Sequence, residues 1–119
     1  MANFPKSARL LKSDDFQQVF NAPQKRSSDR YFTVLGHFYL LADEAEGERM
    51  RLGIAIAKKR VRKAHDRNRL KRLVRESFRH IAQNKSGVDL VVLAKSEAIE
   101  ADNRKLFSSL ARHWQRILS

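Results

Sequence analysis

Apolar positions along the chain recur with the periods of helices and strands, and the first clear pattern is helical. Phe16, Val19 and Phe20 stand three and four residues apart, which predicts a short helix over 13–21 with an aromatic stripe. Residues 24–30 are polar and basic without an apolar repeat, so we expect a loop there. The first predicted helix is therefore followed by an exposed connection.

The middle of the chain is predicted to form strands. Residues 31–41 are rich in aromatic and branched side chains, which favours one strand or two. Residues 43–48 are acidic and include a glycine, so we expect a solvated turn that brings 52–57 back as the second strand of a hairpin. Residues 88–94 are almost continuously apolar, which is typical of a strand buried at a central or parallel position.

Two longer helices are predicted beside these strands. The first spans 66–82 and has an apolar face and an opposite basic face. The apolar face carries Leu70, Leu73, Val74, Ser77, Phe78 and Ile81, and the basic face carries Asn68, Arg72, Arg75 and Arg79. The second is expected to be capped by Asp102 or Asn103, and its core-facing stripe is Leu106, Phe107, Leu110, Trp114 and Ile117. The order α-β-β-α-β-α, with room for one more strand, predicts an α+β fold.

Length and composition limit the class of protein. With 119 residues, 42% of them hydrophobic, we expect a single domain over 1–119, with 1–12 as an extended leader. The chain has no cysteine, which excludes disulfides and fits a reducing cytoplasm. We find no signal-peptide pattern, and no segment reaches the roughly 18 apolar residues of a membrane span. A cytoplasmic location is therefore expected.

Positive charge is concentrated in one segment. The net charge is +12, and residues 58–79 contain eleven Lys or Arg but only two acids. Such a density attracts polyanions, of which nucleic acid is the leading candidate, because its regular phosphates release counterions on binding. A merely solvated face, an anionic membrane surface and a calmodulin-like partner are the alternatives. The last two are weakened because the apolar stripe of this helix is expected to be used by the core.

Three candidate site residues, two phenylalanines and one asparagine, can each be interpreted in two ways. Phe16 and Phe20, one helical turn apart, are either core residues or a stacking platform for single-stranded nucleotides. Asn68 is either a helix cap or a reader of a base edge or 2′-hydroxyl. Four basic residues would supply phosphate contacts near the two phenylalanines: Lys12, Lys25, Arg26 and Arg30.

Residues suited to catalysis are few. The four histidines are scattered, no paired metal-ligand spacing is present, and the four glycines form no phosphate-binding loop. We therefore expect that the protein itself breaks no bond. The acidic residues of 43–48 are interpreted as solubilising charges.

The segment from Lys58 to Arg72, KKRVRKAHDRNRLKR, resembles the signature of the bacterial ribonuclease P protein component. Residues 15–20 (DFQQVF) resemble the first-helix motif of that family, and 89–95 (DLVVLAK) resemble its late strand. The resemblance covers nearly the whole chain. It implies a single-domain α/β sandwich with a left-handed βαβ crossover, an exception to the usual right-handed rule.

The resemblance also implies a function. The protein would bind the catalytic RNA and the single-stranded 5′ leader of precursor tRNA, while the RNA cleaves with divalent metal, normally Mg²⁺, held mainly by the RNA. No protein residue would be catalytic, and neither a membrane nor a protein partner would be required. The RNA-binding residues would be Lys58, Lys59, Arg60, Arg62, Lys63, Arg67, Asn68, Arg69, Lys71, Arg72, Arg75 and Arg79. The leader cleft would contain Lys12, Phe16, Phe20 and Lys95. The alternative from charge alone is a structural RNA-binding protein, such as a ribosomal protein.

Overall fold

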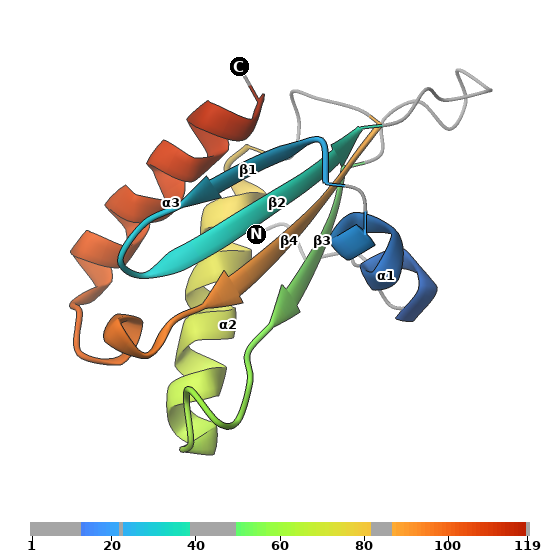
Figure 1. Ribbon diagram of the computed structural model, residues 1–119. Coiled ribbons are helices and arrows are strands. Elements are labelled where there is room, and N and C mark those ends of the chain that lie inside the picture. The colour runs from blue at the N-terminus through green and yellow to red at the C-terminus, as the bar shows by residue number, and fades with distance from the viewer. Residues whose placement is uncertain (1–12, 22, 39–49, 82–86, 119) are drawn as a thin grey trace.

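The computed structural model describes residues 13–21, 23–38, 50–81 and 87–118, which form one four-stranded sheet with helices on both faces (Figure 1). The helices are α1 (Ser13–Asn21), α2 (Ala64–Arg79) and α3 (Asn103–Leu118), with a 3-10 helix, η3 (Ser96–Ile99), before α3. The strands are β1 (Lys25–Ser28), β2 (Phe32–Phe38), β3 (Met50–Ala55) and β4 (Val88–Ala94). The predicted α+β fold is confirmed.

The strand order is β1-β2-β4-β3, with β4 antiparallel to β2 and parallel to β3. The central position predicted for 88–94 is therefore confirmed. The hairpin predicted between 31–41 and 52–57 is wrong, because β4 lies between β2 and β3. A strand that is apolar on both faces gains most from two neighbours and two covered faces, whereas a β2–β3 hairpin would leave it at an edge. Residues 43–48, the predicted hairpin tip, lie outside the described residues.

Side chains alternate between two apolar layers, one on each face of the sheet. On one face Val34 of β2 and Leu90 of β4 are fully buried against α2 and α3. On the other face Leu35 and Val91 pack against Val19 of α1. In Figure 1 α2 lies behind the sheet, and the chain passes through it from β3 to β4 in the left-handed sense. The resemblance implied this crossover, which places the basic helix on the face opposite α1.

Strand β1 was not predicted, since 24–30 is polar throughout and was expected to be a loop. Its backbone pairs antiparallel with β2, so main-chain hydrogen bonds replace the missing apolar alternation. Asp29 turns the chain into β2, because its Oδ1 accepts hydrogen bonds from the backbone N–H groups of Tyr31 (2.9 Å) and Phe32 (3.0 Å). The additional strand therefore comes from the predicted loop and lies at the edge of the sheet, whereas the described part of 31–41 forms β2 alone.

Helices α2 and α3 are joined through one buried polar contact. Trp114 of α3 donates from Nε1 to Ser77 Oγ of α2 at 2.8 Å. Its ring also meets Phe78 edge-on, with centroids 6.1 Å apart. Ser77, predicted on the apolar face of the basic helix, is buried there as the acceptor for the indole N–H. This contact adds to the apolar packing of the basic helix on the core.

Candidate nucleic-acid interface

Helix α2 presents its apolar face to the core and its basic face to solvent, as its periodicity predicts. Leu70, Leu73, Val74, Ser77 and Phe78 are buried. Asn68, Arg72 and Arg75 on the opposite face are exposed. The helix begins at Ala64, two residues before the predicted start at 66. It ends at Arg79, three residues before the predicted end at 82. Lys63 precedes it without a side-chain capping bond, and Asn68 lies inside the helix, so the capping role considered for Asn68 is excluded.

A shallow surface hollow of about 340 Å³ lies along the exposed face of α2. It is lined by Asn68, Lys71, Arg72, Arg75, Glu76 and Arg79. Arg79 donates from Nη1 to Glu76 Oε2 at 2.8 Å, so one of the four cations has a local counter-charge. Within the described part of the chain, Lys71, Arg72 and Arg75 form no ion pair. These three cations are therefore available to phosphate oxygens.

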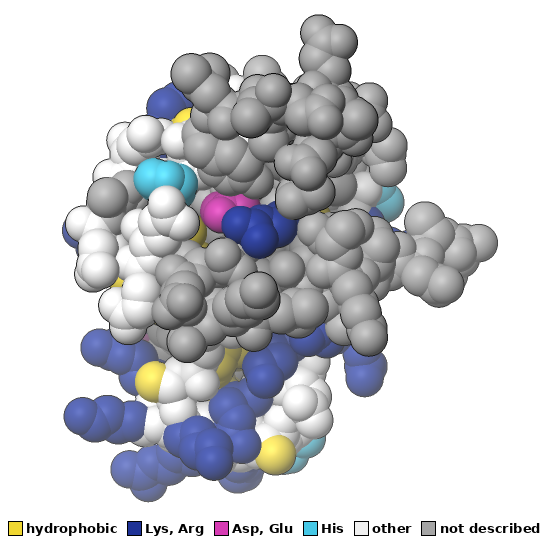
Figure 2. Space-filling view, turned by 90° about the vertical axis from the view of Figure 1, so that its right-hand side faces the viewer, with side chains coloured by type: hydrophobic (Ala, Val, Ile, Leu, Met, Phe, Trp, Pro, Cys, Tyr) yellow, Lys and Arg dark blue, Asp and Glu magenta, His cyan; other side chains and the backbone are white. Residues whose placement is uncertain are grey.

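The connection from β3 to α2 adds a second group of cations. Lys58, Lys59, Arg60, Arg62 and Lys63 are exposed. Between them Val61 is fully buried and anchors the segment, while the backbone N–H groups of Arg60 and Val61 both donate to the Ala57 carbonyl at 3.0 Å. Figure 2 shows Lys and Arg side chains gathered at the lower end of the molecule, where this connection meets the start of α2. The two groups of cations therefore adjoin.

The two arginines of the R-N-R motif contact the protein's own backbone. Arg67 donates from Nη1 to the carbonyls of Val61 (3.0 Å) and Arg62 (2.7 Å). Arg69 donates to the segment between η3 and α3, with Nη1 on the Ile99 carbonyl (3.2 Å) and Nη2 on the Ala101 carbonyl (2.7 Å). Both side chains are half-buried, unlike the exposed Asn68 between them.

Two aromatic residues of the predicted leader cleft differ in their surroundings. Phe16 is half-buried and packs on the small cluster of Val19, Leu35 and Val91. Phe20, one turn further along α1, is 40% exposed. Phe16 thus contributes to the core beneath α1, whereas the ring of Phe20 is open to a partner. Lys12 lies outside the described residues.

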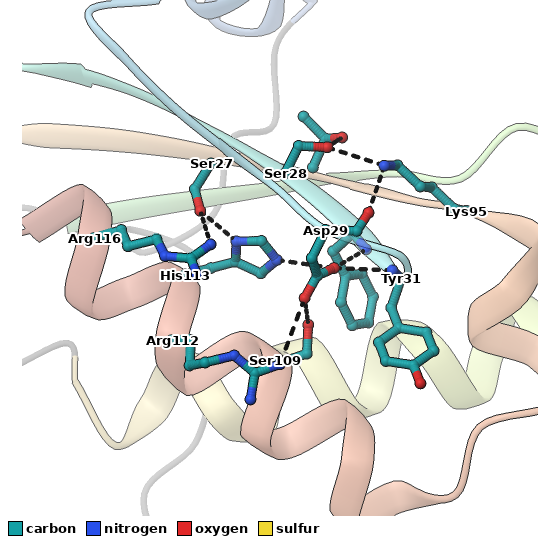
Figure 3. A network of polar contacts seen from close by, with 11 residues as sticks. Ser27, Ser28, Asp29, Tyr31, Lys95, Ser109, Arg112, His113 and Arg116 are labelled. Atoms are coloured by element: carbon teal, nitrogen blue, oxygen red, sulfur yellow. Dashed lines mark hydrogen bonds and ion pairs between the residues drawn. The ribbon is translucent and has the colours of Figure 1, made fainter.

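Lys95, the fourth residue predicted for the leader cleft, ties the end of β4 to the β1–β2 turn (Figure 3). Its Nζ donates to Ser28 Oγ at 2.9 Å and to the Asp29 carbonyl at 2.5 Å. Its backbone N–H donates to the Tyr31 carbonyl at 2.8 Å. The lysine therefore has a structural role at this end of the sheet, and the structure does not bring it into contact with Phe16 or Phe20.

An ion pair on the α1 face of the sheet was not predicted. Arg51 of β3 donates two hydrogen bonds to Asp89 of β4, from Nε to Oδ1 and from Nη2 to Oδ2, both 2.8 Å long. Asp89 is 2% exposed, so the bidentate partner compensates a nearly buried carboxylate. The signal in the sequence was a single acid within the apolar run 88–94.

A second unpredicted cluster joins α3 to the β1–β2 turn (Figure 3). His113 is fully buried, and its Nδ1 lies 2.7 Å from Ser27 Oγ. Its Nε2 lies 3.2 Å from Asp29 Oδ1 without completing a hydrogen bond to any described residue. Asp29 Oδ2 also accepts a hydrogen bond from Ser109. Although these are the residue types of a hydrolase triad, the imidazole is sealed from solvent and Ser27 is 5% exposed, so the cluster acts as a structural link.

The charges of this cluster are set by burial and hydrogen bonding. Burial opposes ionisation of Asp29, but hydrogen bonds from Ser109 and from the Phe32 and Tyr31 backbone outweigh it and lower its pKa to about 2. Burial also lowers the pKa of His113 below its ordinary value, against the favourable effect of Asp29. An anionic Asp29 therefore faces a neutral imidazole near neutral pH.

Two further properties concern metals and membranes. Among residues 13–21, 23–38, 50–81 and 87–118, no group of three or more His, Asp or Glu is arranged to hold a metal ion. None of the helices in these ranges is long and apolar enough to span a membrane.

Comparisons with known proteins agree on one family. The family model for ribonuclease P matches residues 4–118. The ribonuclease P protein component of Thioalkalivibrio sulfidiphilus is 42% identical over 114 residues, covering 96% of this chain and 89% of that one. The Escherichia coli K12 component is 41% identical over 113 residues, covering 95% and 89%. Among solved structures, the RNase P protein of Thermotoga maritima matches with a TM-score of 0.74 at 31% identity, covering 92% and 96%. That of Staphylococcus aureus matches with a TM-score of 0.79 at 25% identity, covering 96% and 100%.

Proposed function

Because the chain belongs to the family of bacterial ribonuclease P protein components, we propose that it binds the catalytic RNA of ribonuclease P and the 5′ leader of precursor tRNA. In this role it assists removal of the leader, which gives the mature 5′ end of the tRNA. The observation that carries the proposal is the acid-poor, solvent-facing surface of α2 with the adjoining 58–63 connection. A cytoplasmic location follows from the same family membership.

The basic surface suits RNA phosphates in both charge and shape. Lys71, Arg72 and Arg75 line the same surface hollow, so their donors are close enough together to contact neighbouring phosphates of one RNA. Guanidinium groups can bridge two phosphate oxygens, which an ammonium does less well. Each phosphate neutralised releases counterions, so binding is strengthened most at low salt. Asn68 beside them has a donor and an acceptor for a base edge or a 2′-hydroxyl.

The leader is assigned to the other face of the sheet, next to α1. Phe20 offers an exposed ring on which an unpaired base can stack, and stacking accepts every base because each has a π-face. A protein of this design tolerates many leader sequences. Phe16 supports the platform from below through its contacts with Leu35 and Val91.

In this proposal the chemical step belongs to the RNA. Divalent metal, normally Mg²⁺, held mainly by the RNA, would polarise the scissile phosphate and activate water. The protein's part is to hold RNA phosphates with its cations and to keep the leader beside α1. No step requires a protein side chain to transfer a proton. The alternative of a ribosomal protein is not favoured by the comparisons, whose matches are ribonuclease P proteins.

Cleavage at limiting Mg²⁺ tests the proposal. Purified protein is mixed with the cognate ribonuclease P RNA and a precursor tRNA, and cleavage is compared with that by RNA alone. We expect the protein to raise the rate at low Mg²⁺, where the RNA's own phosphates repel each other most. No improvement over RNA alone would refute the proposal. Cleavage by rigorously RNA-free protein would refute the assignment of chemistry to the RNA.

A double variant links the activity to the surface. Replacing Arg72 and Arg75 together with Ala should weaken affinity for the RNA. The slope of log affinity against log salt concentration should become shallower by ~1.8, as expected for the loss of two phosphate contacts. Both side chains are exposed and unpaired within the described residues, so stability should change little. An unchanged salt slope would show that this face does not meet RNA phosphates.

A further inference from the structure

We infer that Arg67 and Arg69 are positioning residues, which act on RNA binding by fixing the protein around them. The inference rests on the proposed function and deepens it, since it divides the cations of the basic segment into two roles. Lys71, Arg72 and Arg75 face the hollow of α2, whereas Arg67 and Arg69 turn their guanidinium groups to the protein backbone. Charge alone does not distinguish the two roles.

Arg67 holds the β3–α2 connection, which carries five exposed cations, against the start of α2. Its Nη1 donates to two successive carbonyls, those of Val61 and Arg62, at 3.0 and 2.7 Å. Its backbone N–H donates to the Lys63 carbonyl at 3.1 Å, so both its main chain and its side chain hold the same segment. Val61 is fully buried at the centre of this arrangement. The 58–63 segment is thereby held against the first turn of α2, with its charged side chains directed outward.

Arg69 ties α2 to the beginning of α3. All three of its guanidinium nitrogens donate to the protein. Nη1 donates to the Ile99 carbonyl, Nη2 donates to the Ala101 carbonyl, and Nε and Nη2 donate to Asn103 Oδ1 at 3.2 and 2.8 Å. Ile99 ends η3 and Asn103 begins α3, so one side chain spans this junction. The planar fork has the geometry for this and a lysine ammonium does not.

The acceptors of Arg67 and Arg69 are neutral, so the effect of losing their hydrogen bonds can be tested separately from the effect of losing their charge. Four of the five groups that bind Arg67 and Arg69 are backbone carbonyls and the fifth is an amide oxygen, so the positive charge of each arginine is retained. A lysine at either position keeps that charge but loses the fork. If these arginines served chiefly as phosphate contacts, lysine would keep the charge of each contact and lose only its bidentate geometry, so affinity would fall little and amide exchange would not change. If they hold the structure, lysine would fail although the net charge is unchanged.

The experiment compares R67K and R69K with the matched controls R72K and R75K in the full-length protein. Affinity for the ribonuclease P RNA is measured across a salt series, and amide hydrogen exchange is measured in the free protein. R67K and R69K should bind about tenfold more weakly with an unchanged salt slope. Exchange should accelerate in 58–63 for R67K and in 99–103 for R69K. R72K and R75K keep the charge of the hollow and lose only the bidentate geometry, so they should weaken binding by no more than about threefold, with unchanged exchange.

Asn103→Ala provides a test that leaves every charge and every R-N-R residue in place. It removes the acceptor of two Arg69 hydrogen bonds from α3, so it should weaken RNA binding in the same direction as R69K. In R69K the same substitution should then have little further effect. Ser77→Ala controls for a general loss of stability: it removes the acceptor of the buried Trp114 indole, leaves the hydrogen bonds of Arg67 and Arg69 in place, and should leave RNA affinity unchanged while the protein is folded.

Parent-like RNA affinity of folded R69K and Asn103→Ala would overturn the inference for Arg69, and parent-like affinity of R67K would overturn it for Arg67. A salt slope reduced by about one phosphate, ~0.9, with unchanged exchange would assign direct phosphate contact instead. The exchange measurements on free protein do not depend on RNA. If the parent protein failed to bind the RNA, the proposed function would fail, while the exchange results would still report whether these arginines fix their segments.

Discussion

Glu76 places a carboxylate among the cations that line the α2 hollow, where it pairs with Arg79 at 2.8 Å. A phosphate entering the hollow meets both the repulsion of this carboxylate and an arginine that is already engaged. Glu76→Gln removes the charge and releases Arg79. RNA binding should tighten by about twofold to tenfold, and the salt slope should steepen by about one phosphate. Titrations of the RNA at several salt concentrations measure both quantities.

Glu97→Gln is the control for net charge. Glu97 is an exposed acid on η3, outside the hollow, and its replacement changes the total charge by the same amount. Equal tightening by both variants would show that only overall charge matters, and would contradict a specific role for Glu76.

Phe20 and Phe16 make separable contributions at the α1 face. Phe20→Ala should lower affinity for leader-bearing precursor tRNA more than for mature tRNA, by a factor corresponding to about 1–3 kcal/mol of lost stacking. Because Phe20 is exposed, its loss should leave the melting temperature nearly unchanged. Phe16→Ala should lower both leader affinity and stability, since this ring packs on Leu35 and Val91. Binding of the two tRNAs in the holoenzyme, with thermal unfolding, checks both; equal losses on the two tRNAs would refute the leader assignment of Phe20.

At the scale of elements, the Trp114–Ser77 hydrogen bond adds a buried polar contact to the apolar packing of α2 on α3. Ser77→Ala leaves a buried indole N–H without its acceptor, which should lower the free energy of unfolding by about 1–3 kcal/mol. Denaturant titration measures the loss. Ser108→Ala, an exposed serine on α3, is the matched control and should change stability little. Equal losses in the two variants would show that the buried bond has no special part.

The link between α3 and the β1–β2 turn predicts a dependence of stability on pH. The folded state resists protonation of His113, while the unfolded chain takes up the proton near the ordinary value of 6.5. The free energy of unfolding should therefore fall as pH drops below about 6.5, by at most about 1.4 kcal/mol per pH unit. Asp29 faces the imidazole, and Arg112 and Arg116 lie beside it and disfavour its protonation further. Chemical denaturation between pH 7.5 and about pH 5 measures the slope.

His113→Gln should remove that slope. A second loss should remain in this variant: the folded pKa of Asp29, about 2, lies below the unfolded value of 3.8, so its stabilisation is lost as pH falls between these values. A parent protein whose stability is flat between pH 7.5 and 5 would contradict the assignment to His113.

Elements with strong periodicity were predictable from the sequence, and contacts between distant residues were not. Leu70, Leu73 and Val74 repeat at helical spacing, so the buried and exposed faces of α2 followed directly. Strand β1 has no such repeat, because its side chains are polar and its pairing depends on the β2 backbone. Ser27 meets His113 across 86 positions, and Arg69 meets Asn103 across 34. No local pattern signals such pairs, so arginines that face solvent and arginines that bind the protein itself had the same appearance in the sequence.

At the scale of the whole molecule, the left-handed β3–α2–β4 unit explains how the two proposed RNA-binding surfaces can coexist. The sheet separates α1, with its exposed Phe20, from α2, with its basic face. The substrate leader and the catalytic RNA are thus assigned to different faces, and neither competes for the other's residues. When RNA is absent, the charge of the basic segment lowers the stability of the folded protein, because eleven cations along 58–79 repel each other and only two acids lie among them.

This crowding predicts that salt affects the free protein and its RNA complex in opposite directions. Raising ionic strength from about 0.01 M to about 0.15 M shortens the Debye length from ~30 Å to ~8 Å and screens the repulsion, so the free protein's melting temperature should rise by a few degrees. RNA affinity should fall over the same range. The double variant with Arg72 and Arg75 replaced by Ala has less to screen, so its melting temperature should rise less. Calorimetry of the free proteins decides the matter: a melting temperature that stays constant or falls with salt in the parent protein would show that the basic helix is not held under electrostatic strain.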